Sequence, residues 1–196
     1  MIHGEKDDVN LSLLREFTLK KSQALFEEKF KSLLEIGPPR FSGSLNSAIY
    51  KTNPQWYFSM LELCERNEIA YSSLDIDESV NPTFCGSIEN PDLALKYEQL
   101  KNFSRVVAFS ILEHVSNPFL AIQNIRRILS VGGEIHIITP WDLRFHGPRP
   151  DCWRISDDAY RHLLQNHFEI KKMEFLDQIE RPLSPIAIYV VATRIN

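Results

Sequence analysis

Short apolar runs alternate with amphipathic segments along this chain, and the alternation constrains the fold more than any other feature. Runs that are apolar throughout are typical of strands covered on both faces, as in a parallel sheet. The segments between them repeat apolar residues at helical spacing, which indicates crossover helices. Strands are expected at Ser32–Ile36, Ile69–Ile76, Thr83–Cys85, Arg105–Ser110, Glu134–Thr139, Phe168–Phe175 and Ile186–Arg194.

Local signals predict where the helices begin and end. Asn10 is available as an N-cap for a helix over Leu11–Phe30, and Asn117, followed by proline, caps a helix over Asn117–Leu129 that Val131–Gly133 ends. Ser156 opens another helix with two aspartates in its first turn. Helices are also expected over Pro54–Asn67 and Asp92–Leu100, and loops over Arg40–Tyr50 and Pro140–Arg154.

Strands that alternate with helices predict a mostly parallel sheet, and the last strand pair predicts an antiparallel hairpin at one edge. We therefore expect an α/β, Rossmann-like, seven-stranded sheet with helices on both faces over residues 32–196, after a helical segment over residues 1–31. No internal repeat, linker or low-complexity stretch divides the chain, so residues 1–196 are expected to form a single domain.

The composition excludes several classes of protein. With 196 residues, 43% of them hydrophobic, the chain can bury a sizeable core and is not a disordered segment. Its net charge of −4 and the absence of a Lys/Arg-rich run argue against nucleic acid as a partner. No stretch approaches the roughly 18 apolar residues of a membrane span, and the polar, acidic N-terminus differs from a signal peptide. The three cysteines, Cys64, Cys85 and Cys152, form no C-x-x-C pair, and an odd number leaves one unpaired in any disulfide scheme, so we expect a reducing, cytoplasmic compartment.

Ordered motifs follow the expected strands. They are Leu34–Gly37, Leu74–Asp77, Phe84–Asn90, Ser110–Val115 and Ile125–Gly133. In this order they resemble the class I S-adenosylmethionine-dependent methyltransferases of the small bacterial type, over Leu33–Val191. The later stretch Thr139–Arg154 resembles a subgroup associated with polysaccharide and natural-product gene clusters.

The resemblance implies S-adenosylmethionine as cofactor, bound at the carboxyl ends of the strands. It implies that Gly37 borders the methionine portion, that Asp75 accepts from the ribose hydroxyls, and that Ser87 and the Ile88 backbone meet the adenine. Asp77 competes with Asp75, because a register slip of two residues would exchange them, and an Asp after a strand is also a common turn former. The implied cofactor residues are Glu35, Gly37, Pro38, Asp75, Ser87, Ile88, Ser110 and Leu112.

The chain departs from the family pattern after Gly37, where Pro38, Pro39 and Arg40 replace the further glycines. Proline fixes φ and removes a backbone donor, so this loop does not cradle the cofactor as a glycine-rich turn does. Arg40 also places a cation near a cationic ligand, and Arg105 lies where the fourth strand commonly opens on an acidic residue. These departures predict weakened cofactor binding.

Methyl transfer to a hydroxyl also needs a general base, and histidine has a suitable unperturbed pKa. His114 follows the fourth expected strand and His146 the fifth, so either imidazole is a candidate, with structural roles as the alternative. Asp151 could orient an imidazole, act as the base itself, or form a turn.

An acceptor pocket could be lined by Trp141, Trp153 and Arg154, because an arginine fork recognises phosphate or carboxylate. Core packing is the alternative for the tryptophans, and Asp151 is an alternative partner for Arg154. Glu113 and His114 are two adjacent metal-ligand types without a third or fourth, so the sequence predicts no metal site.

The leading hypothesis is methyl transfer to a small-molecule acceptor, a sugar or a related cluster metabolite, at oxygen or nitrogen. The alternative is a non-catalytic protein of the same fold that acts as a binding or assembly subunit, and a homodimer is compatible with either. A nicotinamide-dependent oxidoreductase is disfavoured because no G-x-G-x-x-G follows an expected strand.

Overall fold

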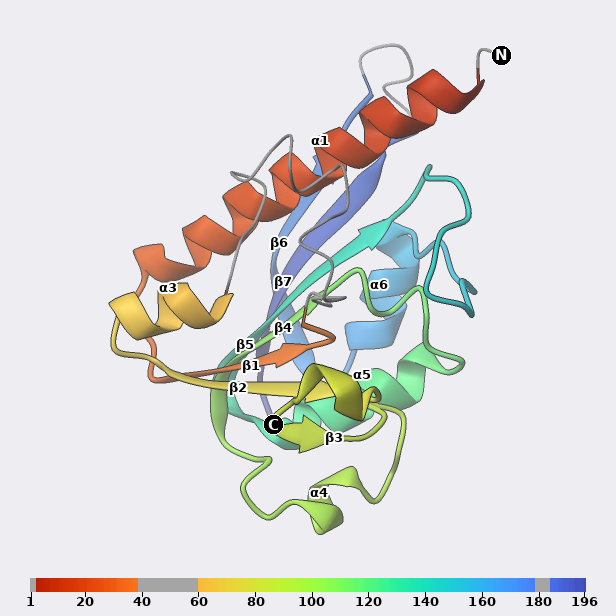
Figure 1. Cartoon of the computed structure of the whole chain (residues 1–196). Helices are drawn as coiled ribbons and strands as arrows, with labels where there is room; N and C mark the ends of the chain where they lie inside the picture. The colour runs from red at the N-terminus through yellow and green to blue at the C-terminus, as the bar shows by residue number, and fades with distance from the viewer. Residues whose placement is uncertain (1–2, 39–59, 179–183) are drawn as a thin grey trace.

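The computed structural model describes residues 3–38, 60–178 and 184–196, with the side chains from residue 9 onward. These residues form a seven-stranded sheet in the order β3-β2-β1-β4-β5-β7-β6 (Figure 1). The strands are β1 Ser32–Ile36, β2 Ala70–Asp75, β3 Phe84–Cys85, β4 Phe103–Phe109, β5 Leu129–Pro140, β6 Phe168–Leu176 and β7 Ala187–Arg194.

The pairing of the strands confirms the expected topology. β3, β2, β1, β4 and β5 are parallel neighbours, whereas β7 pairs antiparallel with both β5 and β6. The chain runs from β1 outward to β3 and then returns to place β4 on the other side of β1. The strand order therefore reverses between β1 and β4, and the carboxyl ends of these two strands form the position where open α/β sheets bind ligands.

Separate apolar clusters cover the two faces of the sheet. α5 (Pro118–Ile128) and α6 (Asp157–Leu164) pack on one face, and α1 (His3–Ala24) and α3 (Met60–Arg66) lie on the other (Figure 1). β1 contributes to both faces by alternation, since Leu34 packs with the α5 side and Leu33 with the α3 side. A sheet buried on both faces explains why its central strands are apolar throughout.

Two expected helix ends are confirmed by their caps. The Asn117 side chain accepts a hydrogen bond from the backbone N of Leu120 at 3.1 Å, and Pro118 follows at the first helical position of α5. The Ser156 side chain accepts from the backbone N of Ala159 at 3.2 Å and opens α6. Both caps satisfy a backbone donor that the first helical turn leaves unpaired.

Other helix boundaries differ from the prediction. α1 begins at His3, so Asn10 lies inside the helix and is not its N-cap, and the helix ends at Ala24 before a 3-10 turn, η1, over Leu25–Glu27. Residues 3–8, HGEKDD, include no large apolar residue, so the apolar periodicity misses the start of the helix. The helix expected over Asp92–Leu100 is reduced to α4, Leu93–Lys96.

Contrary to the prediction, the segment Val131–Gly133 does not end α5. The helix ends at Ile128, and Leu129 is already extended as the first residue of β5, with φ −70 and ψ 146. Val131–Gly133 instead lies within β5, beside a shift of register between β4 and β5. The glycines therefore belong to an irregular strand start, which glycine in a strand commonly marks.

Parts of the expected pattern fall outside the described residues. These are the loop over Arg40–Tyr50 and the first part of the helix over Pro54–Asn67, whose second part is α3. None of the helices in the described ranges is long and apolar enough to cross a membrane.

Candidate functional site

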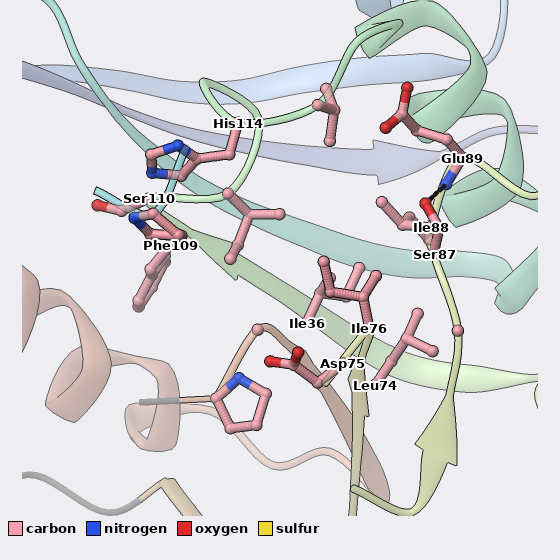
Figure 2. Close-up of a pocket in the computed structure, with 16 residues that line it drawn as sticks. Ile36, Leu74, Asp75, Ile76, Ser87, Ile88, Glu89, Phe109, Ser110 and His114 are labelled. Atoms are coloured by element: carbon pink, nitrogen blue, oxygen red, sulfur yellow. Dashed lines mark hydrogen bonds between the residues drawn. The ribbon is translucent and has the colours of Figure 1, made fainter. Parts of the chain in front are cut away.

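A cavity of ≈ 380 Å³ opens at the carboxyl ends of β1, β2 and β4, where the strand order reverses. Figure 2 shows side chains from these strands and from the loop after β3 facing it. The walls are mainly apolar, with Ile36, Leu74, Ile76 and Ile111 among them. Most of the predicted cofactor residues and one candidate base line this cavity: Gly37, Pro38, Asp75, Ser87, Ile88, Ser110 and His114.

Gly37 allows the chain to turn sharply at the floor of the cavity. Its φ is +65, in the left-handed region, and its backbone N donates to the carbonyl of Leu74 at 2.9 Å. A Cβ at this position would lie 2.1 Å from Cδ1 of Ile111. Only glycine therefore fits here without moving a side chain that lines the cavity.

The structure separates the two aspartates that the sequence left as competitors. Asp75 is buried and lines the cavity, and its Oδ1 accepts from the backbone N of Asp77 at 2.8 Å. Asp77 instead caps a short 3-10 helix, η3 (Glu78–Val80), and its side chain accepts from the backbone N of Ser79 at 3.0 Å. Of the two aspartates, Asp75 therefore lines the cavity, and Asp77 belongs to the turn that follows.

The loop after β3 is held against the start of α5. The Glu89 carboxylate accepts from the backbone N of Asn117 at 2.7 Å, and the Ser87 hydroxyl accepts from the backbone N of Glu89 at 3.1 Å. The amide of the buried Asn124 donates to the carbonyl of Ile88 at 2.7 Å. These bonds fix the cavity wall. The sequence analysis assigned no role to Glu89 or Asn124, and only Asn124, a polar residue on the apolar face of α5, gave a signal.

Glu35 and Leu112 do not line the cavity, contrary to the prediction. Side chains alternate along β1, so Ile36 faces the cavity and Glu35 points to the opposite face of the sheet. There Glu35 accepts a hydrogen bond from the Tyr71 hydroxyl at 2.6 Å, and burial raises the pKa of Glu35 to about 7. Leu112 is fully buried in the core between the sheet and α5.

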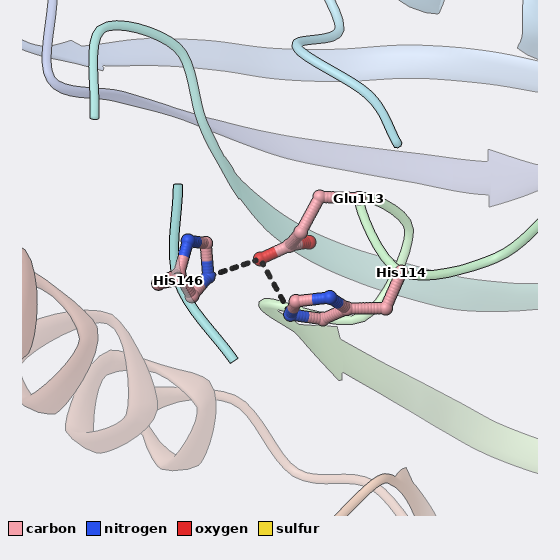
Figure 3. A group of neighbouring side chains, drawn as sticks. All are labelled: Glu113, His114 and His146. Atoms are coloured by element: carbon pink, nitrogen blue, oxygen red, sulfur yellow. Dashed lines mark ion pairs between the residues drawn. The ribbon is translucent and has the colours of Figure 1, made fainter. Parts of the chain in front are cut away.

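A second group of polar side chains lies beside the cavity and consists of Glu113, His114 and His146, named here the EHH cluster. Figure 3 shows the Glu113 carboxylate between the two imidazoles. Its Oε1 lies 3.9 Å from Nε2 of His114 and 3.7 Å from Nε2 of His146. The imidazole rings meet edge to face, with their centroids 5.1 Å apart. The neighbouring Glu113 carboxylate raises the pKa of His146.

Asp151 and Arg154 pair with each other and fix the loop that carries His146. Nη1 of Arg154 lies 2.6 Å from Oδ1 of Asp151, and the guanidinium also donates to the carbonyls of Leu143 and Arg144. The Arg154 guanidinium holds the pKa of Asp151 well below its usual range. Asp151 also accepts from the backbone N of His146 at 2.9 Å. This pairing fits a structural clamp better than a catalytic base or a receptor for an anionic acceptor.

The two predicted acceptor tryptophans lie outside the cavity lining. Trp141 packs on the core, with its ring 5.9 Å from that of Phe175. Trp153 is partly exposed, and its indole N donates to the carbonyl of Val115 at 2.8 Å. Neither residue therefore joins the cavity, whose lining at the end of β4 includes Phe109, Ser110, Ile111 and His114 instead.

Comparisons with known proteins place the fold. No family model matches the sequence, and no curated protein does. A methyltransferase dependent on S-adenosylmethionine from Archaeoglobus fulgidus superposes with a TM-score of 0.63 and 14% identity, over 92% of this chain and 94% of that one. A second such methyltransferase, from Methanosarcina mazei, gives a TM-score of 0.56 and 12% identity, over 86% of this chain and 94% of that one. The cyclase SpnF superposes with a TM-score of 0.60 and 14% identity, over 90% of this chain and 80% of that one. The chain therefore has the fold of the S-adenosylmethionine-dependent methyltransferases.

Proposed function

We propose that this protein binds S-adenosylmethionine in the cavity and transfers its methyl group to a small-molecule acceptor. One observation carries the proposal: Gly37, Asp75 and Ser87, from three separate strand ends, line a single cavity at the point where the strand order reverses. The fold shared with methyltransferases of this cofactor supports the assignment.

The residues of the cavity match the chemistry of the cofactor. Asp75 offers a buried carboxylate to the ribose hydroxyls, and Ser87 with the backbone of Ile88 offers polar contacts to the adenine. Ile36 and Ile76 provide apolar surface for the rings. The cofactor supplies an electrophilic methyl group, so the protein has chiefly to hold it in line with the acceptor atom and to exclude water.

The acceptor side of the cavity carries the candidate base. His114 lines the cavity, and His146 lies behind it in the EHH cluster. Because Asp151 is engaged with Arg154, the two imidazoles are the better candidates to take a proton from an acceptor hydroxyl. We propose a sugar or a related cluster metabolite as the acceptor.

Calorimetric titration with S-adenosylhomocysteine tests cofactor binding directly. We expect Asp75→Asn to weaken binding by about tenfold or more, because a hydrogen bond to a charged group contributes roughly 1.5–3 kcal/mol. Asp77→Asn is the matched control and should leave the affinity within about twofold. Absence of measurable heat at millimolar ligand with the wild-type protein would refute the proposal.

A non-catalytic binding role is the second candidate, and Pro38 favours it. Pro38 lines the cavity where the backbone of a glycine-rich turn would otherwise approach the ligand, and it has no N–H to donate. The cyclase SpnF, which shares the fold, is named for a different reaction, so the fold alone does not fix the chemistry. Binding of S-adenosylhomocysteine without methyl transfer to any acceptor of a metabolite extract would favour this role.

Cellular location and assembly belong to the same proposal. The three cysteines, Cys64, Cys85 and Cys152, are free thiols, which supports a reducing, cytoplasmic compartment. We further propose one domain over residues 1–196, with a homodimer as the alternative to a monomer. Size-exclusion chromatography with light scattering distinguishes the two states.

A further inference from the structure

We propose that the EHH cluster, Glu113, His114 and His146, is a binding site for one divalent transition-metal ion of the Zn²⁺ type. Within the described part of the chain, these three residues each offer a ligand atom, and the three atoms all lie within 4.8 Å of one another. The sequence predicted no metal here because the third ligand comes from a loop after β5 and only the fold brings it to the other two.

The Glu113 carboxylate is the first observation that points to a missing ligand. It is fully buried, and neither of its oxygens has a hydrogen-bond donor among the residues that the structure describes. The imidazole nitrogens that face it, at 3.9 and 3.7 Å, are too far for hydrogen bonds. A buried carboxylate without donors is strongly unfavourable, and a cation among the three side chains would remove that cost.

The orientation of the imidazoles is the second observation. Nδ1 of His114 lies 2.7 Å from the carbonyl oxygen of Pro150, which can only accept, so Nδ1 carries the hydrogen. Nδ1 of His146 lies 3.3 Å from the carbonyl of Arg144 and 3.4 Å from Oδ2 of Asp151, which are again acceptors. In a neutral imidazole this leaves the lone pair on Nε2, the atom that faces Glu113 in both residues. Metal-ligating histidines show this same pattern, with the other ring N–H donated to a carbonyl or carboxylate.

The donor set determines which class of ion fits. Two imidazoles and one carboxylate suit Zn²⁺ and similar transition metals, whereas Mg²⁺ and Ca²⁺ prefer oxygen ligands. Ligands at about 2.0–2.2 Å from one tetrahedral ion lie roughly 3.3–3.6 Å apart. Oε1 of Glu113 lies 3.9 and 3.7 Å from the two Nε2 atoms, so a small inward rotation of the side chains would bring these ligands to a common ion. Three protein ligands leave a position open, as in catalytic rather than structural zinc sites.

The EHH cluster lies beside the cavity, because His114 belongs to the cluster and also lines the cavity. An ion there would lower the pKa of an acceptor hydroxyl and would occupy the Nε2 atoms that would otherwise serve as base. This catalytic role rests on the proposed methyl transfer, whereas metal binding itself does not.

The test is a titration of the tag-free protein, stripped with a chelator, with Zn²⁺ by calorimetry and with Co²⁺ by visible absorption. We expect about one Zn²⁺ per chain, and Co²⁺ bands of a site with nitrogen ligands. His146→Gln, on a surface loop, should weaken Zn²⁺ binding at least about tenfold. His162→Gln, on the exposed side of α6, is the matched control and should leave the Zn²⁺ affinity unchanged.

Three outcomes would overturn the site. They are no Zn²⁺ binding by the wild type, binding that survives His146→Gln unchanged, and preference for Mg²⁺ over Zn²⁺. Glu113→Gln adds a second variant, whose folding is checked by circular dichroism because the residue is fully buried. S-adenosylhomocysteine titrated into the same preparation separates the two proposals: ligand binding without Zn²⁺ binding rejects only the metal site, and the reverse rejects only the cofactor.

Discussion

The cavity and the EHH cluster lie side by side at one edge of the sheet but are built in different ways. The cavity is shaped by backbone geometry and apolar walls, with Gly37 at a left-handed turn and Asp75 as its buried carboxylate. The EHH cluster depends on ionisable side chains that the loop after β5 brings together. The cavity is therefore fixed by the sheet itself, whereas the cluster depends on a clamp that holds a loop.

Two buried glutamates, Glu35 and Glu113, differ in the same way in the groups that surround their carboxylates. Glu35 receives a hydrogen bond from the Tyr71 hydroxyl, which stabilises its carboxylate in the core, although burial still raises the pKa of Glu35 to about 7. Glu113 receives none from the described residues and faces two imidazoles instead. A carboxylate with a hydroxyl donor fits a structural role, whereas one that faces two imidazole nitrogens beyond hydrogen-bond distance fits a metal ligand.

Gly37→Ala should have the largest effect on the cavity. The alanine would have an unfavourable left-handed φ, and its Cβ would lie 2.1 Å from Cδ1 of Ile111, so the Ile111 side chain, which lines the cavity, would have to move. We expect a loss of about 2–5 kcal/mol in the free energy of unfolding and of at least about tenfold in the affinity for S-adenosylhomocysteine. Urea denaturation and calorimetry measure the two effects.

Gly132→Ala is the matched control for this change. Gly132 also has a positive φ, +81, but a Cβ there meets nothing within 4 Å. We therefore expect only the backbone strain, about 1–2 kcal/mol, and unchanged ligand binding. Equal loss of binding in both variants would show that Gly37 acts through global stability and not through the cavity.

The sequence predicted the cavity better than the EHH cluster for a physical reason. Gly37, Asp75 and Ser87 each follow a strand within a few residues, and parallel strands bring their carboxyl ends to one edge without further information. His146 reaches Glu113 only because the loop after β5 folds back, and no local pattern specifies that path. Glu35 shows the same limit at shorter range, because β1 is buried on both faces and its sequence pattern does not indicate which of Glu35 and Ile36 faces the cavity.

Glu35→Gln should have an intermediate effect that depends on pH. Burial raises the pKa of Glu35 from 4.5 to about 7, so the folded state holds this proton more tightly than the unfolded state. Stability from this group is fully present below pH 4.5 and is lost as the pH rises to about 7. Relative to wild type, the variant should therefore gain about 2–3 kcal/mol between pH 5 and pH 8. Chemical denaturation at both pH values checks this, and an equal difference at the two would contradict it.

Arg154→Lys should have the smallest effect and bears on the clamp of the EHH cluster. Lysine keeps the charge beside Asp151 but cannot also reach the carbonyls of Leu143 and Arg144. Since the Arg154 side chain is 25% exposed, we expect a loss of only about 1 kcal/mol in unfolding free energy. Arg66→Lys is the matched control. Its partner Glu62 is an exposed neighbour on α3, so the change should cost less than about 0.5 kcal/mol in unfolding free energy.

Zn²⁺ affinity should fall several-fold in Arg154→Lys and not in Arg66→Lys, because only Arg154→Lys removes the contacts that fix the position of His146. Equal Zn²⁺ affinity in wild type and Arg154→Lys would mean that the loop holds His146 without the clamp.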